Sequence, residues 1–155
     1  MMKVKRMLYS VCLIALIIMF SGCTEANNQK PNFPSAHVQY FAKYGWTLKN
    51  YEAVNQYERG ALLGVKEHYN MLMNDAKLDL APYASKEIIE SGYDLEEAVG
   101  PYNDIIGYVL ECDGKIIGSY LELQQETLNG DVYDITKGPT VPIVKPGDVM
   151  TKFQN

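Results

Sequence analysis

The chain has 155 residues, of which 47% are hydrophobic and 21% are charged, and its formal net charge is −5 at pH 7. This length corresponds to one domain, with a core large enough to fold without a structural metal. The acidic balance argues against nucleic-acid binding, because phosphates are bound by basic patches.

The N-terminus is predicted to be a lipoprotein signal peptide, residues 1–22, that is cleaved. Three basic residues within 3–6 precede an apolar run over 7–20, and a Ser-Gly pair and Cys23 follow. The run is shorter than the roughly 20 residues of a transmembrane helix, and the order of segments is that of a secretory signal. The end of the run resembles a lipobox, so we expect Cys23 to carry a diacylglycerol at the outer face of the cytoplasmic membrane. An ordinary secretory signal and an uncleaved membrane anchor are the alternatives.

Residues 23–34 are predicted to be the lipidated cysteine and a flexible tether, because the stretch is polar and contains two prolines. Ser35 is a predicted helix N-cap, and apolar residues recur at helical spacing over 36–44. Gly45 is expected to end that helix in a left-handed conformation. Alternation over 46–54 then predicts a strand.

A second helix is predicted over 59–74. Its apolar stripe consists of Leu62, Val65, Tyr69 and Leu72, which recur at spacings of three, four and three. Residues 86–95 are compatible with a helical turn, but their β-branched and aromatic content favours a strand near Tyr93.

The clearest local structure is a hairpin of strands 105–112 and 115–123. Asp113-Gly114 joins them and is the favoured sequence for a two-residue type I′ turn, in which both residues have positive φ. This turn predicts four opposed pairs: Cys112 with Lys115, Leu110 with Ile117, Tyr108 with Ser119, and Ile106 with Leu121.

Residues 132–135 are predicted to add a further strand, and 137–155 to form an extended C-terminal segment containing prolines, either an edge strand or a tail. Residues 35–136 then form a single α+β domain. In this domain about two helices pack on one face of a small antiparallel sheet of three to five strands.

No catalytic, cofactor-binding or metal-binding residue is expected. His37 and His68 have no evident serine or cysteine partner in the sequence, and Cys112 is expected to be a buried, unreactive thiol. The acidic residues between 87 and 97 lack the spacing of a calcium loop and are expected to form a solvated face.

Several short motifs resemble a known domain. They are Phe41-Ala42-Lys43-Tyr44-Gly45-Trp46, Tyr69-Asn70, Leu78-Asp79-Leu80 with Tyr83, and Gly114-Lys115-Ile116-Ile117-Gly118. Over residues 36–124 the chain is similar to an uncharacterised domain-of-unknown-function family found in lipoproteins and exported proteins of Gram-positive spore-forming bacteria. It departs from that pattern at residues 51–60, where polar residues are added. The resemblance implies a shared fold and a Gram-positive source, and it carries over no active-site residue.

These patterns together predict a membrane-anchored extracytoplasmic lipoprotein that is not an enzyme. We expect it to bind a partner protein or wall component or to sense the state of the envelope, through an apolar patch or an unpaired sheet edge. The alternative is a small-ligand or cell-wall glycan binder that uses some of the 12 tyrosines. The partner itself is not specified by the sequence.

Overall fold

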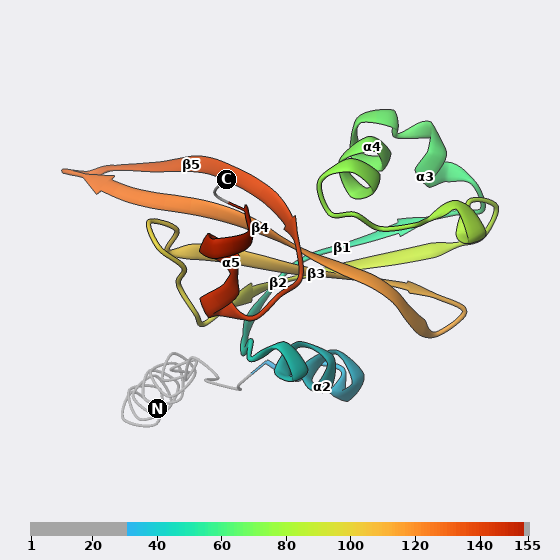
Figure 1. Cartoon of the computed structure of the whole chain (residues 1–155), viewed down its shortest axis with the longest axis horizontal. Coiled ribbons are helices and arrows are strands. Elements are labelled where there is room, and N and C mark those ends of the chain that lie inside the picture. The colour runs from blue at the N-terminus through green and yellow to red at the C-terminus, as the bar shows by residue number, and fades with distance from the viewer. Residues whose placement is uncertain (1–30, 154–155) are drawn as a thin grey trace, which may run out of the picture. The chain divides into compact units, whose positions relative to one another are not determined.

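A computed structural model describes residues 31–153 of the 155-residue chain. The predicted signal peptide and Cys23 lie outside these described residues. Five strands form one antiparallel sheet in the order β1-β2-β3-β4-β5 (Figure 1). They are β1 (Leu48–Tyr57), β2 (Ile88–Leu95), β3 (Asp104–Cys112), β4 (Lys115–Asn129) and β5 (Val132–Pro142). The helices are α2 (Ser35–Tyr44), α3 (Ala61–Gly64), α4 (Lys66–Asn74) and α5 (Pro146–Phe153), with a short 3₁₀ turn η1 (Ala81–Tyr83).

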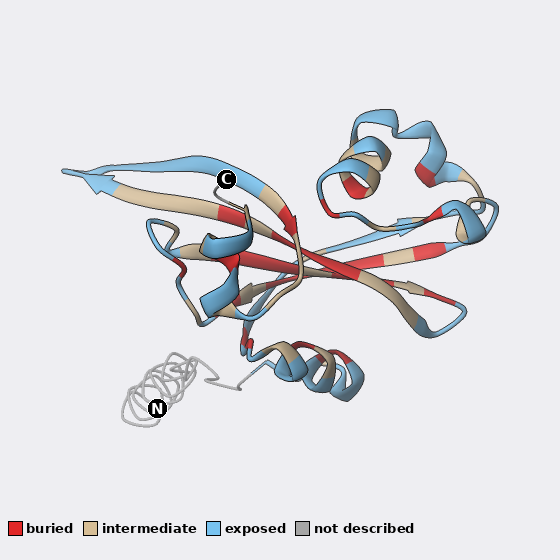
Figure 2. Cartoon of the chain, viewed as in Figure 1, coloured by how far each residue is buried: buried red, intermediate tan, exposed pale blue. Residues whose placement is uncertain are grey.

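Both faces of the sheet carry helices, and each face has its own apolar core. Phe41 of α2 and Val149 of α5 pack with Tyr93 of β2 on one side, which we call the α2 face. Leu62 of α3 and Leu72 of α4 pack on the other side, which we call the α4 face. The predicted antiparallel sheet of three to five strands is therefore confirmed. The prediction of about two helices on one face is wrong, because residues 31–153 contain four helices and these pack on both faces. Alternating side chains along β2 to β4 reach both cores, and Figure 2 shows the buried residues along these central strands.

The first predicted helix and strand are confirmed, although the N-cap of the helix is Pro34 and not Ser35 as predicted. The second predicted helix is interrupted. Gly45 ends α2 with φ 85°. The stretch predicted as one helix over 59–74 is divided into α3 and α4 at Val65, which has φ −92° and ψ 69°. The break lets Leu62 and Leu72 both reach the sheet while Val65 stays 46% exposed. The predicted stripe is thus wrong at Val65, where the adjoining Gly64 weakens the helix.

The β3–β4 turn is confirmed, because Asp113 and Gly114 have φ values of 51° and 70°. Cys112 lies opposite Lys115 as predicted, but the other three predicted pairs are wrong. A register shift between Leu110 and Glu111 leaves Ile117 without an opposed residue, so that Tyr108 faces Tyr120. A one-residue shift moves every later side chain to the other face of the sheet, and here it places Tyr120 in one core and Leu121 in the other.

The C-terminal residues extend the sheet and then return to it. β5 forms an edge of the sheet and continues to Pro142. A proline is tolerated on an edge strand because it has no N–H to donate to a neighbouring strand. The sequence did not predict α5, which begins at Pro146 and buries Val149 against the α2-face core. Within residues 31–153, no helix is long and apolar enough to span a bilayer.

Candidate functional site

The most highly connected polar group on the α4 face is the carboxylate of Glu90, which is only 1% exposed. Its Oε1 accepts hydrogen bonds from His68 Nε2 at 3.0 Å and from the Tyr120 hydroxyl at 2.9 Å. Its Oε2 accepts from Asn55 Nδ2 at 3.2 Å and from the Tyr57 hydroxyl at 3.1 Å. We call these five side chains, contributed by β1, α4, β2 and β4, the Glu90 cluster.

Charge and hydrogen bonding determine the protonation state of this cluster. Burial raises the pKa of Glu90, but the hydrogen bond and positive charge of His68, with the bonds from Asn55 and Tyr120, outweigh burial and lower the pKa overall. The bond to Glu90 raises the pKa of His68. The pair therefore favours the ionised state, and four donors already occupy the carboxylate. Such a group holds α4 on the sheet and has little capacity left to accept a substrate proton.

The sequence interpretation of this region needs two corrections. Glu90 was expected on a solvated acidic face, but it is buried because α4 covers it. His68 was expected to lack a partner, and so was His37. His37 is buried on α2, where it bonds the Tyr93 hydroxyl and lies 3.1 Å from Glu111 Oε2. The two histidines belong to opposite faces of the sheet and do not form one site.

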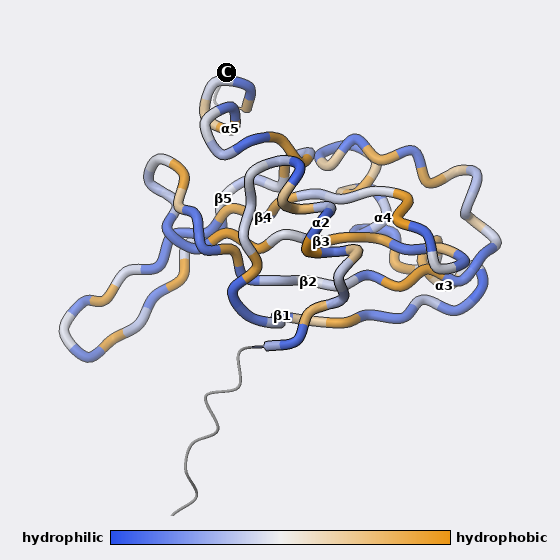
Figure 3. The backbone as a smooth tube through the Cα atoms, turned by 90° about the horizontal axis from the view of Figure 1, so that it is seen from below, coloured by the Kyte–Doolittle hydropathy of each residue, from blue (hydrophilic) through white to orange (hydrophobic). Residues whose placement is uncertain are grey.

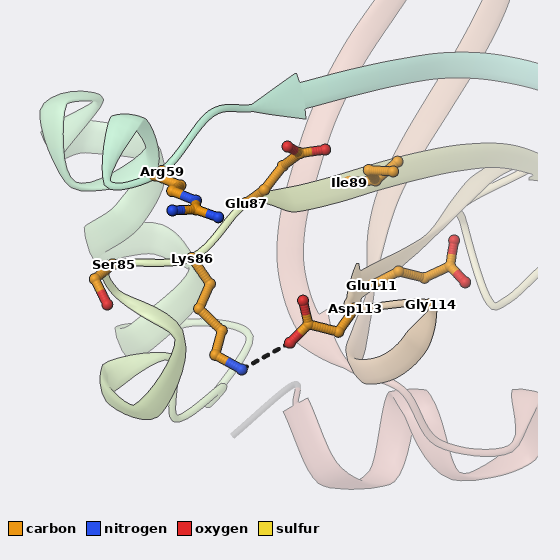
Figure 4. Close-up of a pocket in the computed structure, with 8 residues that line it drawn as sticks. All are labelled: Arg59, Ser85, Lys86, Glu87, Ile89, Glu111, Asp113 and Gly114. Atoms are coloured by element: carbon orange, nitrogen blue, oxygen red, sulfur yellow. Dashed lines mark hydrogen bonds and ion pairs between the residues drawn. The ribbon is translucent and has the colours of Figure 1, made fainter.

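An open polar groove of about 510 Å³ lies between the start of β2 and the β3–β4 turn. Arg59, Lys86 and Glu87 line one side, and Glu111 and Asp113 line the other (Figure 4). Lys86 Nζ is 2.7 Å from Asp113 Oδ2 and so bridges the two sides. Among the described residues, the lining contains no aromatic ring on which a sugar would stack and no histidine. Its charged side chains suit the binding of a polar group.

The distal part of the β4–β5 hairpin projects beyond the helices (Figure 1). It exposes four large apolar side chains: Leu128 at 68%, Val132 at 65%, Tyr133 at 59% and Ile135 at 48%. Leu128 lies opposite Tyr133, and Ile135 lies opposite Glu126. Directly opposed residues share a face, so Leu128, Tyr133 and Ile135 form one line, which we call the apolar stripe. Figure 3 shows apolar positions recurring along this otherwise hydrophilic hairpin.

The remaining predicted residue in the described chain is Cys112. Its side chain is buried and free, and burial together with the adjacent Asp113 raises the pKa of the thiol. A raised pKa keeps the thiol protonated and therefore a weak nucleophile. Among residues 31–153, no group of three or more histidine, cysteine or acidic side chains has an arrangement that would hold a metal ion.

A family model described as Domain of unknown function (DUF4830) matches residues 40–121. The match is in keeping with the resemblance to an uncharacterised domain that the sequence motifs indicated. It runs from α2 into β4 and so includes strands and helices of both cores, while the apolar stripe and α5 lie after it. No curated protein and no solved structure matches the chain.

Proposed function

Because the chain belongs to the DUF4830 family, whose description assigns no activity, we propose its function from its own surfaces. We propose a non-enzymatic protein-interaction module of the cell envelope. The lipid on Cys23 holds it at the outer face of the cytoplasmic membrane, and the distal β4–β5 hairpin contacts a partner protein.

The exposed apolar stripe is the observation that carries this proposal. Its three members are each between 48% and 68% exposed, although leucine and isoleucine are residue types that are usually buried. Fully burying an exposed apolar side chain contributes roughly 1.5–3 kcal/mol, and covering the part of each that is still exposed contributes a share of this. A rimmed apolar patch on a projecting element is typical of a contact surface.

A protein suits the stripe better than a lipid bilayer does. The turn that leads the hairpin consists of Asn129, Gly130 and Asp131, and it is polar. A tip that entered the membrane would place Asp131 in the hydrocarbon first, at a cost of several kcal/mol. The stripe lies along the flank of the hairpin, where a partner protein covers it without burying that carboxylate.

The saturation of the Glu90 cluster supports a binding role over an enzymatic one. The cluster contains a histidine, a carboxylate and two tyrosines, which are the groups of acid–base catalysis. Their donors all converge on the same buried carboxylate, and both of its oxygens are occupied. A general base needs a lone pair aimed at a substrate proton.

Site-specific crosslinking in cells tests the proposal. A photo-reactive amino acid replaces Tyr133 on the stripe in one strain and Val54 on β1, which is 62% exposed, in a control strain. We expect a discrete protein adduct at Tyr133 that is absent at Val54 and is lost when Leu128→Ser is added. The same adduct pattern at both positions, or no effect of Leu128→Ser, contradicts the proposal.

The lipid anchor has its own test. Cys23→Ala removes the sulfur that would be acylated, so the variant is expected to leave the membrane fraction or to remain unprocessed. Mass spectrometry of the wild-type protein is expected to show a diacylated Cys23 as the first residue. Residues 1–22 still attached to the wild-type mature protein would contradict the anchor.

The polar groove favours a second candidate, the binding of a small ligand or a cell-wall fragment. Arg59 lines the groove and forms no ion pair with another described residue, so its charge suits an anionic ligand group. Acidic cell-wall peptides and acidic amino acids are suitable probes. A rise in melting temperature that disappears in Arg59→Gln, but not in Lys66→Gln on α4, would favour this role.

A further inference from the structure

The α4 face is only partly covered. The α3 and α4 helices lie over one end of the sheet, while β4 and β5 continue well beyond them (Figure 1). A row of five opposed residues crosses the sheet outside the α4-face core; it consists of Asn50, Asp94, Ile106, Glu122 and Thr140. Opposed residues share a face, and Ile106, although only 5% exposed among its neighbours on the sheet, belongs to neither apolar core. We call this region the open half of the α4 face.

The open half concentrates negative charge. Asp94 and Glu122 belong to the row, and Asp104 lies opposite Gln124 in the next row. Glu126 follows two positions later on β4 and therefore points to the same side. These four carboxylates are half-buried.

Few cations offset these carboxylates. Lys137 acts on Glu122 and Lys49 acts on Asp104, and each lowers the pKa of its neighbour. Burial still raises the pKa of both carboxyl groups, and the charges of Glu126 and Asp94 raise that of Asp104 further. An additional positive charge nearby would therefore stabilise the ionised form of these carboxylates.

The acidic surface continues directly into the apolar stripe. On β4, Glu122, Gln124, Glu126 and Leu128 alternate to one side, and Ile135 and Tyr133 lie opposite the last two. One sheet face therefore presents carboxylates at the body of the domain and exposed apolar side chains along the hairpin. Two independent properties, charge and apolar exposure, occur on the same face of the same strand.

We propose that this continuous surface binds a basic, amphipathic segment of the partner protein. Lysine or arginine side chains of the segment would pair with Asp94, Asp104 and Glu122, and its apolar side chains would cover Leu128 and Tyr133. The inference rests on the proposed function and adds the chemistry of the partner. Charge complementarity is what selects this occupant.

Other occupants fit the surface less well. A second copy would bring two sets of carboxylates together in a chain whose net charge is −5. An anionic bilayer repels the same groups. Of these three occupants, only a cationic segment reduces the repulsion between the carboxylates.

A peptide of known composition tests the charge requirement. The probes are a labelled peptide of alternating lysine and leucine and a matched peptide of alternating glutamate and leucine, each titrated with the detergent-solubilised full chain. The test variant is Asp104→Asn with Glu122→Gln. The control is Glu67→Gln with Asp75→Asn, which removes the same charge from α4 and its C-cap.

We expect the lysine peptide to bind, the glutamate peptide not to bind, and added salt to weaken the complex. The test variant is expected to weaken binding about tenfold, as the loss of two partly buried ion pairs does, and the control is expected to leave it unchanged. The melting temperature of the test variant is expected not to fall, because the substitution relieves repulsion. Equal weakening in both variants, or wild-type binding by the test variant, overturns the inference.

The crosslinking strain separates this inference from the proposed function. Loss of the Tyr133 adduct in Asp104→Asn with Glu122→Gln supports the inference. If the adduct is retained in Asp104→Asn with Glu122→Gln but lost in Leu128→Ser, the inference of a basic partner is overturned and the proposed function stands. If the adduct is retained in both variants, the proposed function is overturned. A dimer in sedimentation that Leu128→Ser dissociates, or binding of the Cys23→Ala chain to anionic vesicles, assigns the surface to a second copy or to lipid and also overturns the inference.

Discussion

Glu90→Gln removes one buried charge while leaving the shape of the side chain almost unchanged. In the glutamine, the amide nitrogen faces Asn55 and Tyr57, and both of these side chains can accept a hydrogen bond from it once they reorient. The amide oxygen still accepts hydrogen bonds from His68 and Tyr120. Most contacts therefore survive, and the loss is the charge-assisted part of the bonds to Glu90. Hydrogen bonds to a charged group contribute roughly 1.5–3 kcal/mol, so we expect the free energy of unfolding to fall by about 2 kcal/mol near pH 6.

The effect should depend on pH in a direction that the structure determines. The pKa of His68 is raised above 6.5 by its bond to Glu90, so its contribution is complete below about pH 6.5 and is lost as pH rises through the folded-state pKa. The pKa of Glu90 is lowered, so its contribution is complete above its ordinary pKa of about 4.5 and is lost as pH falls through the folded-state pKa. The difference between wild type and Glu90→Gln is therefore expected to be largest between about pH 4.5 and 6.5.

Urea denaturation of the two proteins from pH 4 to 9, followed by circular dichroism, measures this difference. Glu87→Gln is the matched control, because Glu87 is exposed on the same segment and, among the residues that the structure describes, bonds only Gln56, at 2.9 Å. The control is expected to change the free energy of unfolding by less than about 0.5 kcal/mol. A Glu90→Gln variant as stable as wild type at pH 6, or a difference that does not change with pH, would refute the assignment of an ionised pair.

Three further outcomes follow from the backbone and the cores. Gly114→Val is expected to lower the free energy of unfolding by about 1–3 kcal/mol, because a β-branched residue is strained at φ 70° although its Cβ would meet no atom; unchanged melting would contradict the turn. Gly107→Ala is expected to cost about 1–3 kcal/mol in denaturation, because its Cβ would lie 2.5 Å from Cε1 of the buried Phe41; a neutral effect would mean that the core yields there. Cys112 is expected to react slowly with a thiol reagent in the native protein and rapidly in urea, and fast native labelling would contradict its burial.

Local sequence signals predicted those parts of the fold that local chemistry determines. Asp113-Gly114 requires positive φ at both positions, and Gly45 requires it at the end of α2, so the residue types alone locate these two features. The same logic fails at Ile117. The register shift at Ile117 places Tyr120 in the core under α4 and Leu121 in the core on the other face. The core under α4 forms only when that helix packs on the sheet, so the residues of the hairpin alone do not indicate the shift.

The candidate sites were less accessible to sequence reasoning for the same physical reason. Glu90 looks like its neighbours Glu87 and Glu96, which are exposed, and what distinguishes it is the helix that covers it. The alternation of Ile88, Glu90 and Gly92 to one face of β2 was the available signal. The short α5 was missed because its stability comes from packing Val149 into the α2-face core.

Glu90 and Glu122 show how one sheet face serves two purposes. Both are partly or fully buried on the α4 face, and burial raises the pKa of each. Glu90 receives four hydrogen bonds from within the domain, which reverse that effect and make the group a fixed part of the scaffold. Glu122 has a bond from Tyr108 and the charge of Lys137, which do not offset burial, so its pKa stays raised. A carboxylate that is partly buried without sufficient hydrogen-bond donors is stabilised when another molecule brings a donor. This difference between Glu90 and Glu122 is why we place the partner on the open half of the α4 face.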